Sequence, residues 1–179
     1  MTSDRSVLAA AAVLLLAPLL GAAVPVTALQ PPTRPTVQHA IALKIPTYTL
    51  SPVERETVAA CLVLEAASQG DLGMRGVMAV IRNRAEGHPE LFAPTVLKQK
   101  QFSSLNRLTS GQETLWRAIQ RAKRDRMWPT ALKIVDAATE DTWYDPTDGA
   151  THYTRRGEHT AWTRSLACTV IIGRHAFYR

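Results

Sequence analysis

The segment from Ser51 to Ala67 constrains the fold of this chain more than any other, because it carries a complete helix signal. Ser51, Pro52 and Glu54 are typical of a helix N-terminus: serine suits the N-cap, proline suits the first helical position, and the glutamate completes a capping box. Apolar residues follow at helical spacing along the rest of the segment. The sequence therefore predicts a helix that ends near Ala67, where residues 68–71 break it.

Further helices are predicted downstream, and strand signals gather only near the end of the chain. A second helix is expected over 72–87, with Gly87 as its C-cap glycine. The region 88–104 contains two prolines and is predicted to consist mainly of loops. The other predicted elements are a helix opened by a capping box at 110–113, a helix from Thr130, and strand-like runs at 150–153 and 166–172. The sequence thus predicts a mainly helical α+β domain with a small β element near its C-terminus.

The N-terminal part of the chain predicts export. Residues 1–28 combine an apolar run with small residues at a cleavage site after Ala28, which is typical of a signal peptide. An uncleaved signal anchor is the alternative, although Pro18 weakens the run as a membrane helix. Residues 29–50 form a Pro-rich linker, and residues 51–179 hold a single catalytic domain. The expected location is the periplasm or the extracellular space.

The formal net charge of +6 favours an anionic partner. Bacterial wall polymer, nucleic acid and an acidic membrane surface all fit such a charge. An exported protein meets little DNA, so nucleic acid is not expected. Contact with a membrane is expected only through the N-terminal segment if that segment stays uncleaved. The chain is expected to be a monomer.

Two cysteines, Cys61 and Cys168, lie far apart in the sequence. In an oxidising compartment they could pair, but a buried, unpaired Cys61 is an equal alternative. The five histidines form no H-E-x-x-H motif and no Cys-x-x-Cys accompanies them. No metal site and no cofactor are therefore predicted.

Glu65 is the strongest candidate for chemistry. Seven of the eight glutamates lie in polar or loop contexts, whereas Glu65 stands in an apolar helical run. A carboxyl group in such a place is either an error of patterning or a functional group, and an apolar surrounding favours its protonated form. That property suits a proton donor in glycosidic cleavage. The alternative is a structural ion pair with Arg82 or Arg84 from the next helix.

From Cys61 to Arg179, the chain resembles the SleB and CwlJ type of bacterial cell-wall hydrolases. The motifs that carry the resemblance keep their order and spacing. They are Glu65-Ala66, Gly73, Ala79-Val80-Ile81-Arg82-Asn83-Arg84, Gln101-Phe102-Ser103, Tyr153, Trp162 and Ile172-Gly173-Arg174-His175-Ala176-Phe177.

The resemblance implies a lysozyme-like fold whose catalytic glutamate, here Glu65, ends the first helix beside a groove for a glycan strand. It further implies peptidoglycan as the partner, and cleavage between N-acetylmuramic acid and N-acetylglucosamine by a lytic transglycosylase. Hydrolysis of the same strand is the alternative chemistry. Substrate-assisted chemistry explains how a single carboxyl group can suffice.

One departure from the family pattern leaves a second reading open. The family usually carries another glutamate where this chain has Gln69, which can form hydrogen bonds but cannot transfer a proton. A non-catalytic peptidoglycan-binding protein that keeps the fold is therefore an alternative function. The candidate substrate-binding residues are Gln69, Gln101, Phe102, Ser103, His152, Tyr153 and Trp162, with a core position as an equal alternative for Phe102 and Trp162.

Overall fold

The structure is a computed structural model that describes residues 48–179. The predicted signal segment and residues 29–47 of the linker lie outside the described residues. The helices are α1 (Pro52–Ala66), α2 (Gly70–Arg84), α3 (Phe92–Leu97), α4 (Asn106–Thr109), α5 (Leu115–Lys123) and α6 (Trp128–Ala138), and the strands are β1 (His152–Arg155), β2 (Cys168–Ile172) and β3 (His175–Tyr178). Short 3₁₀ segments occur at Ala67–Gln69, Pro89–Leu91, Ser103–Leu105 and Trp162–Arg164. Within 48–179, none of the helices has the length and apolarity that crossing a bilayer requires.

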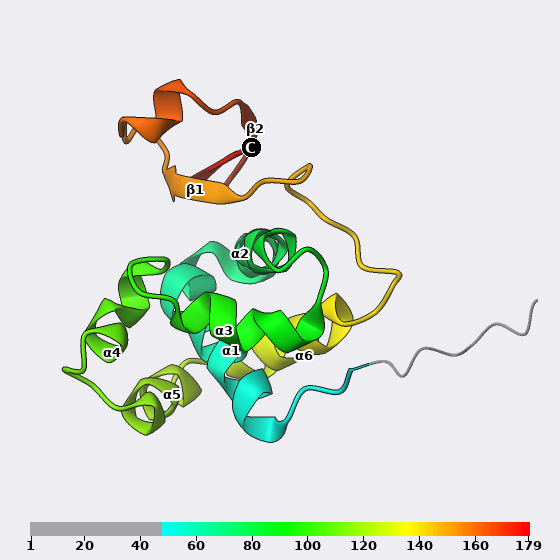
Figure 1. Ribbon diagram of the computed structural model, residues 1–179, viewed down its shortest axis with the longest axis vertical. Coiled ribbons are helices and arrows are strands. Elements are labelled where there is room, and N and C mark those ends of the chain that lie inside the picture. Colours follow the sequence, from blue (N-terminus) through cyan, green and yellow to red (C-terminus); the bar gives the residue numbers. More distant parts are fainter. Residues whose placement is uncertain (1–47) are drawn as a thin grey trace, which may run out of the picture. The chain divides into compact units, whose positions relative to one another are not determined.

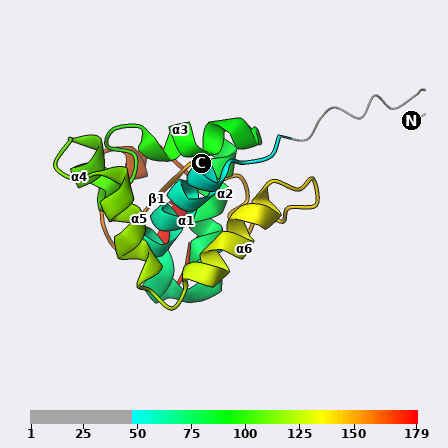
Figure 2. The same ribbon diagram turned by 90° about the horizontal axis from the view of Figure 1, so that it is seen from below.

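Helix α1 is the central helix of the domain. Its predicted capping box is confirmed: the Ser51 hydroxyl accepts from the Glu54 N–H at 3.3 Å, and the Glu54 carboxylate accepts from the Ser51 N–H at 2.8 Å. Residues 57–63 are all buried, so the helix is covered on every side over two turns. The helices α2, α3, α5 and α6 pack around it (Figure 2).

The three strands form one antiparallel sheet in the order β1-β3-β2. The sheet lies over α2 (Figure 1), where Ile172 and Phe177 pack with Val80 in a second, smaller apolar cluster. Gly76 of α2 allows this close approach, because a Cβ atom there would lie 2.6 Å from the Phe177 ring. The predicted mainly helical α+β domain with a small C-terminal β element is confirmed.

Several predicted boundaries were wrong. The region 88–104, predicted as loop, contains α3, and Pro94 fits there because it occupies the first turn, where N–H groups have no partner within the helix. The capping box predicted at 110–113 does not form. Ser110 instead ends α4, and the Thr114 hydroxyl caps α5. Helix α6 begins at Trp128, before the predicted Thr130, with Pro129 in its first turn.

The sequence also missed the strand β3. Its residues follow a two-residue turn at Gly173 and Arg174. The two cysteines are free thiols: Cys61 lies in the core, whereas Cys168 is exposed on β2. The alternative of a buried, unpaired Cys61 therefore holds.

Candidate active site

The carboxylate of Glu65 lies in the last turn of α1 and accepts hydrogen bonds on both oxygens. Oε1 accepts from the Ser104 N–H at 2.7 Å and from the Ser103 hydroxyl at 3.3 Å. Oε2 accepts from the Tyr153 hydroxyl at 2.9 Å. Among residues 48–179, Glu65 forms no salt bridge, so the alternative of a structural ion pair with Arg82 or Arg84 does not hold.

The donors to Glu65 come from two different parts of the chain. Ser103 and Ser104 open the 3₁₀ segment before α4, while Tyr153 belongs to β1. Arg84, at the end of α2, holds these two parts in place. Its Nε donates to the Thr151 carbonyl at 2.6 Å, beside β1, and its Nη1 donates to the Gln101 side chain at 3.0 Å. One half-buried guanidinium thus connects both walls of the site.

The hydroxyl of Tyr153 is a fixed donor. Burial raises its pKa well above 10.0, and the negative charge of Glu65 raises it further. The ring of His175 lies 5.1 Å from the Tyr153 ring, and burial lowers the pKa of this histidine although the charge of Glu65 opposes that effect. At neutral pH both groups are therefore uncharged. The Tyr153 hydroxyl keeps its proton and donates a hydrogen bond to Glu65.

Glu65 borders an open cleft of about 280 Å³. The other residues that line it are Val63, Leu64, Ala67, Ser68, Arg121 and Asp125. Asp125 is the second carboxylate of this cleft, and its Oδ1 accepts from the Met127 N–H at 2.8 Å. An acidic group, a second carboxylate and a guanidinium therefore face the same solvent-filled space.

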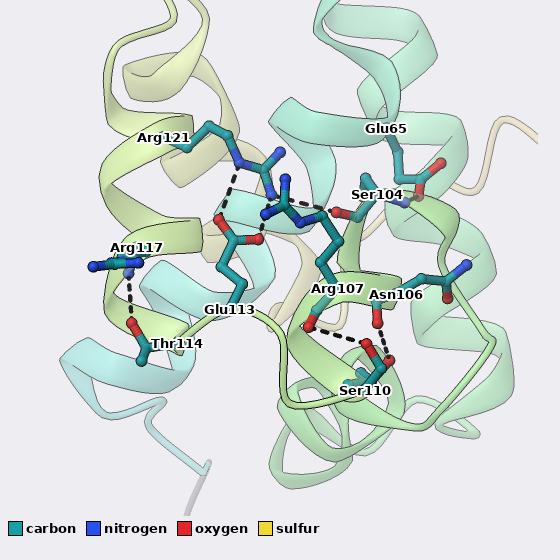
Figure 3. A network of polar contacts seen from close by, with 10 residues as sticks. Glu65, Ser104, Asn106, Arg107, Ser110, Glu113, Thr114, Arg117 and Arg121 are labelled. Atoms are coloured by element: carbon teal, nitrogen blue, oxygen red, sulfur yellow. Dashed lines mark hydrogen bonds and ion pairs between the residues drawn. The ribbon is translucent and has the colours of Figure 1, made fainter.

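Arg121 of α5 binds Ser104, one of the two serines that donate to Glu65 (Figure 3). Its guanidinium donates to both oxygens of Glu113, at 3.3 and 2.9 Å, and Nη2 also donates to the Ser104 carbonyl at 3.4 Å. The same Ser104 presents its N–H to Glu65. Arg121, itself paired with Glu113, thus restrains Ser104, whose N–H binds the Glu65 carboxylate.

A family model described as Cell Wall Hydrolase matches residues 68–178. This chain belongs to the cell wall hydrolase family. The match covers the residues that donate hydrogen bonds to Glu65, but Glu65 itself lies three residues ahead of its start. As a member of this family, the chain is an enzyme that acts on peptidoglycan, a polymer outside the cytoplasm.

Two solved structures share the fold of this cell wall hydrolase. One is the catalytic domain of the germination-specific lytic transglycosylase SleB from Bacillus anthracis, with 24% identity, a TM-score of 0.54, and coverage of 73% of this chain and 97% of the other. The other is the catalytic domain of the Bacillus cereus SleB protein, with 23% identity, a TM-score of 0.53, and coverage of 73% and 93%. No curated protein matches the chain.

The structure brings some of the predicted site residues of this cell wall hydrolase together and separates others. Ser103 and Tyr153 both contact Glu65, whereas Gln101 binds Arg84, which in turn binds the Thr151 carbonyl beside β1. Phe102 is only 2% exposed and belongs to the core, with the Arg84 guanidinium 5.4 Å from its ring centroid. The core alternative therefore holds for Phe102.

Among the described residues, Gln69, His152 and Trp162 form no hydrogen bond with Glu65. Gln69 accepts from the Arg174 N–H at 2.8 Å, in the turn between β2 and β3. The ring of His152 packs on that of Trp162 at 5.3 Å. Side chains alternate along a strand, so His152 faces away from the sheet surface that Tyr153 shares with Glu65.

Sequence reasoning did not single out Ser104, Arg121, Asp125 or His175 as site residues. The contribution of Ser104 is a backbone N–H, which any residue type provides, so no sequence signal could have indicated it. Arg121 has no distinguishing sequence signal, because it is one of several basic residues within 117–126. His175 lies within the motif Ile172–Phe177 and could have been found there.

Proposed function

We propose that this enzyme cleaves the glycan strand between N-acetylmuramic acid and N-acetylglucosamine as a lytic transglycosylase, with Glu65 as its single acid and base. The observation that carries the proposal is the set of three donors that hold both Glu65 oxygens at the edge of the cleft. A carboxyl group so restrained needs little reorganisation when a proton is transferred.

The proposed reaction is balanced without added water. The Glu65 carboxyl donates its proton to the oxygen that bridges the two sugars, and the bond from the muramic C1 to that oxygen breaks. The Glu65 carboxylate then takes the proton of the muramic C6 hydroxyl, whose oxygen bonds to C1. The products are a free 4-hydroxyl on the glucosamine sugar and a 1,6-anhydro ring on the muramic sugar, and Glu65 is protonated again.

Hydrolysis is the second candidate, and one observation favours it. Asp125 lines the same cleft as Glu65, so a water molecule between the two carboxylates could attack C1 in place of the C6 hydroxyl. The Asp125 oxygen Oδ1 already accepts from a backbone N–H, which leaves Oδ2 for such a role. The two chemistries differ in the released ends: an anhydro end and a reducing end differ in mass by one water.

Mass spectrometry of fragments released from purified sacculi tests the proposal. Glu65→Gln should bind sacculi as the wild type does, yet cleave roughly 10² to 10⁴ times more slowly, because the amide keeps the shape but donates no acidic proton. Asp125→Asn is the matched variant and should keep activity and the anhydro product. Cleavage at the wild-type rate by Glu65→Gln would falsify the assignment, and loss of activity in Asp125→Asn with reducing ends in the wild type would favour hydrolysis.

We also propose that residues 1–28 are removed on export, since the substrate lies outside the cytoplasm and the sequence after the apolar run suits cleavage following Ala28. N-terminal sequencing of the exported protein should then begin near Leu29. An exported form that still starts at Met1 would favour the anchor.

A further inference from the structure

The outer face of α5 carries a second recess, of about 410 Å³, next to the cleft of Glu65. Its lining residues are Glu113, Trp116, Arg117, Gln120, Arg121 and Arg124. Those on the helix repeat at spacings of three and four residues, so they share one face of it. The opposite face, with Ala118, Ile119 and Ala122, packs into the core.

Trp116 in this recess is 68% exposed. The core side of α5 is filled without it, so this large apolar ring does not contribute to the packing of the domain. An indole with an exposed flat face is well suited to stacking on the apolar face of a sugar ring. Trp116 therefore provides a contact surface and no visible support to the fold.

The charge of the recess is positive. Its one carboxylate, Glu113, is already paired with Arg121. Within the part of the chain that the structure describes, Arg117 and Arg124 form no salt bridge, and both are exposed. Two guanidinium groups beside Trp116 are therefore free to form bidentate hydrogen bonds with carboxylates.

Arg121 lines both the recess and the cleft that contains Glu65. The two spaces are thus adjacent along α5, and Trp116 lies five residues, or about 7.5 Å along the helix axis, from Arg121. A polymer bound at Glu65 that continues past Arg121 reaches this surface next.

We propose that Trp116, Arg117 and Arg124 form an accessory binding surface for the peptidoglycan strand, beyond the sugars that are cleaved. A sugar ring stacks on the Trp116 indole, and carboxylates of the stem peptides bind Arg117 and Arg124. The inference rests on the proposed function, because it takes the strand at Glu65 as its starting point. Peptidoglycan suits the surface because its repeating units combine sugar faces with carboxylates, and the chain carries a formal net charge of +6.

Binding is measured in the Glu65→Gln background, so that cleavage does not interfere. The two probes are soluble glycan strands that keep their stem peptides and strands from which the peptides have been removed. Trp116→Ala should bind both probes roughly fivefold to thirtyfold more weakly. The double variant Arg117→Gln, Arg124→Gln should lose affinity only for the strands with peptides, and its loss should shrink as salt is added.

Two matched controls separate this surface from general effects. Tyr144→Ala removes an aromatic ring that is 78% exposed elsewhere, and Arg155→Gln with Arg156→Gln removes two exposed charges at the end of β1. Both controls should bind as the parent does. Equal losses in the two double arginine variants would mean that only net charge matters and would overturn the surface, as would unchanged binding in Trp116→Ala. A loss seen with anionic lipid vesicles but not with strands would also overturn it in favour of a membrane.

The outcome is independent of the catalytic assignment. If Glu65→Gln cleaves sacculi normally while Trp116→Ala still weakens strand binding, the mechanism fails and the accessory surface stands. Thermal unfolding of each variant checks that the exposed substitutions leave the fold intact.

Discussion

The helical body and the C-terminal sheet of this enzyme are stabilised in different ways. Around α1 the helices share one large apolar core that runs from Val58 to Ala138. The sheet shares only a small apolar cluster with α2, and two α2 side chains also donate hydrogen bonds to carbonyls just ahead of β1: Asn83 to Ala150 at 2.9 Å and Arg84 to Thr151 at 2.6 Å.

This difference bears directly on the active site, because the two regions meet at Glu65. The helical body carries Glu65 and the serine donors, whereas the sheet carries Tyr153. Changes to the attachments of the sheet should therefore alter the position of one donor while leaving the carboxylate itself in place. The acid and one of its donors thus belong to two regions that are stabilised differently.

Among the changes that test this comparison, removal of the Tyr153 hydroxyl is expected to have the largest effect. Tyr153→Phe keeps the ring but loses the hydrogen bond to the Glu65 carboxylate, which should reduce cleavage about 10-fold to 100-fold, since hydrogen bonds to charged groups contribute about 1.5 to 3 kcal/mol. Ser103→Ala is the matched change on the helical side and should cost less, because the shorter bond from the Ser104 N–H remains. Initial rates on sacculi measure both, and a larger loss in Ser103→Ala would contradict the comparison.

Gly76→Ala should loosen the sheet without unfolding the helical body. The added Cβ would meet the Phe177 ring at 2.6 Å, and overpacking of this kind costs about 1 to 3 kcal/mol. Hydrogen exchange should show faster exchange in β1 and β3, with α1 unchanged. Equal acceleration of exchange in α1 would mean that the two regions unfold together.

Low pH should reduce the stability of the C-terminal sheet. Burial lowers the pKa of His152 and His175 below 6.5 in the folded protein. Burial alone would raise the pKa of Asp145, but hydrogen bonds from Thr147, Asn83 and Gly149 together lower it below 3.8. All three groups bind protons more readily when unfolded, so their stabilising contributions are complete above the unfolded pKa and are lost as the pH falls towards the folded pKa.

These pKa shifts predict that the sheet loses stability in two pH ranges. The histidine contribution should decline as the pH drops below about 6.5, and the Asp145 contribution should decline below about 3.8. Hydrogen exchange in β1 and β3, measured at several pH values, checks both. His152→Gln should remove part of the stability loss that is expected below about pH 6.5. If hydrogen exchange showed that the sheet becomes more stable as the pH falls from 7 to 5, the predicted direction of the pH effect would be wrong.

The smallest expected effect concerns Gln69. Gln69→Ala removes the acceptor for the Arg174 N–H and should cost about 0.5 to 1.5 kcal/mol of stability. Gln69→Glu keeps an acceptor there and should preserve or raise activity, since it also restores the usual family residue. Thermal unfolding and the cleavage rate distinguish the two variants, and a strong loss of activity in Gln69→Glu would show that the neutral amide itself is required.

Local sequence signals predicted a helix correctly where its formation depends only on residues close by in the chain. The capping box at Ser51 and the helical spacing that follows it predicted α1 correctly. The capping box at 110–113 failed because the backbone of Gln112 and Glu113 bonds to the Arg107 carbonyl, which continues the turn after α4 instead of opening a helix. The same four-residue pattern thus had two outcomes, and packing decided between them.

The sequence by itself determined that a capped, apolar helix carries Glu65 near its end, because helix formation and apolar periodicity depend on residues only a few positions apart. Only the tertiary structure decided what surrounds that carboxylate. The Ser104 N–H and the Tyr153 hydroxyl reach it from 39 and 88 residues away, and Gln69 is bound to a turn 105 residues later. Contacts over such separations depend on how the sheet and the helices pack together, which no local pattern of residues encodes.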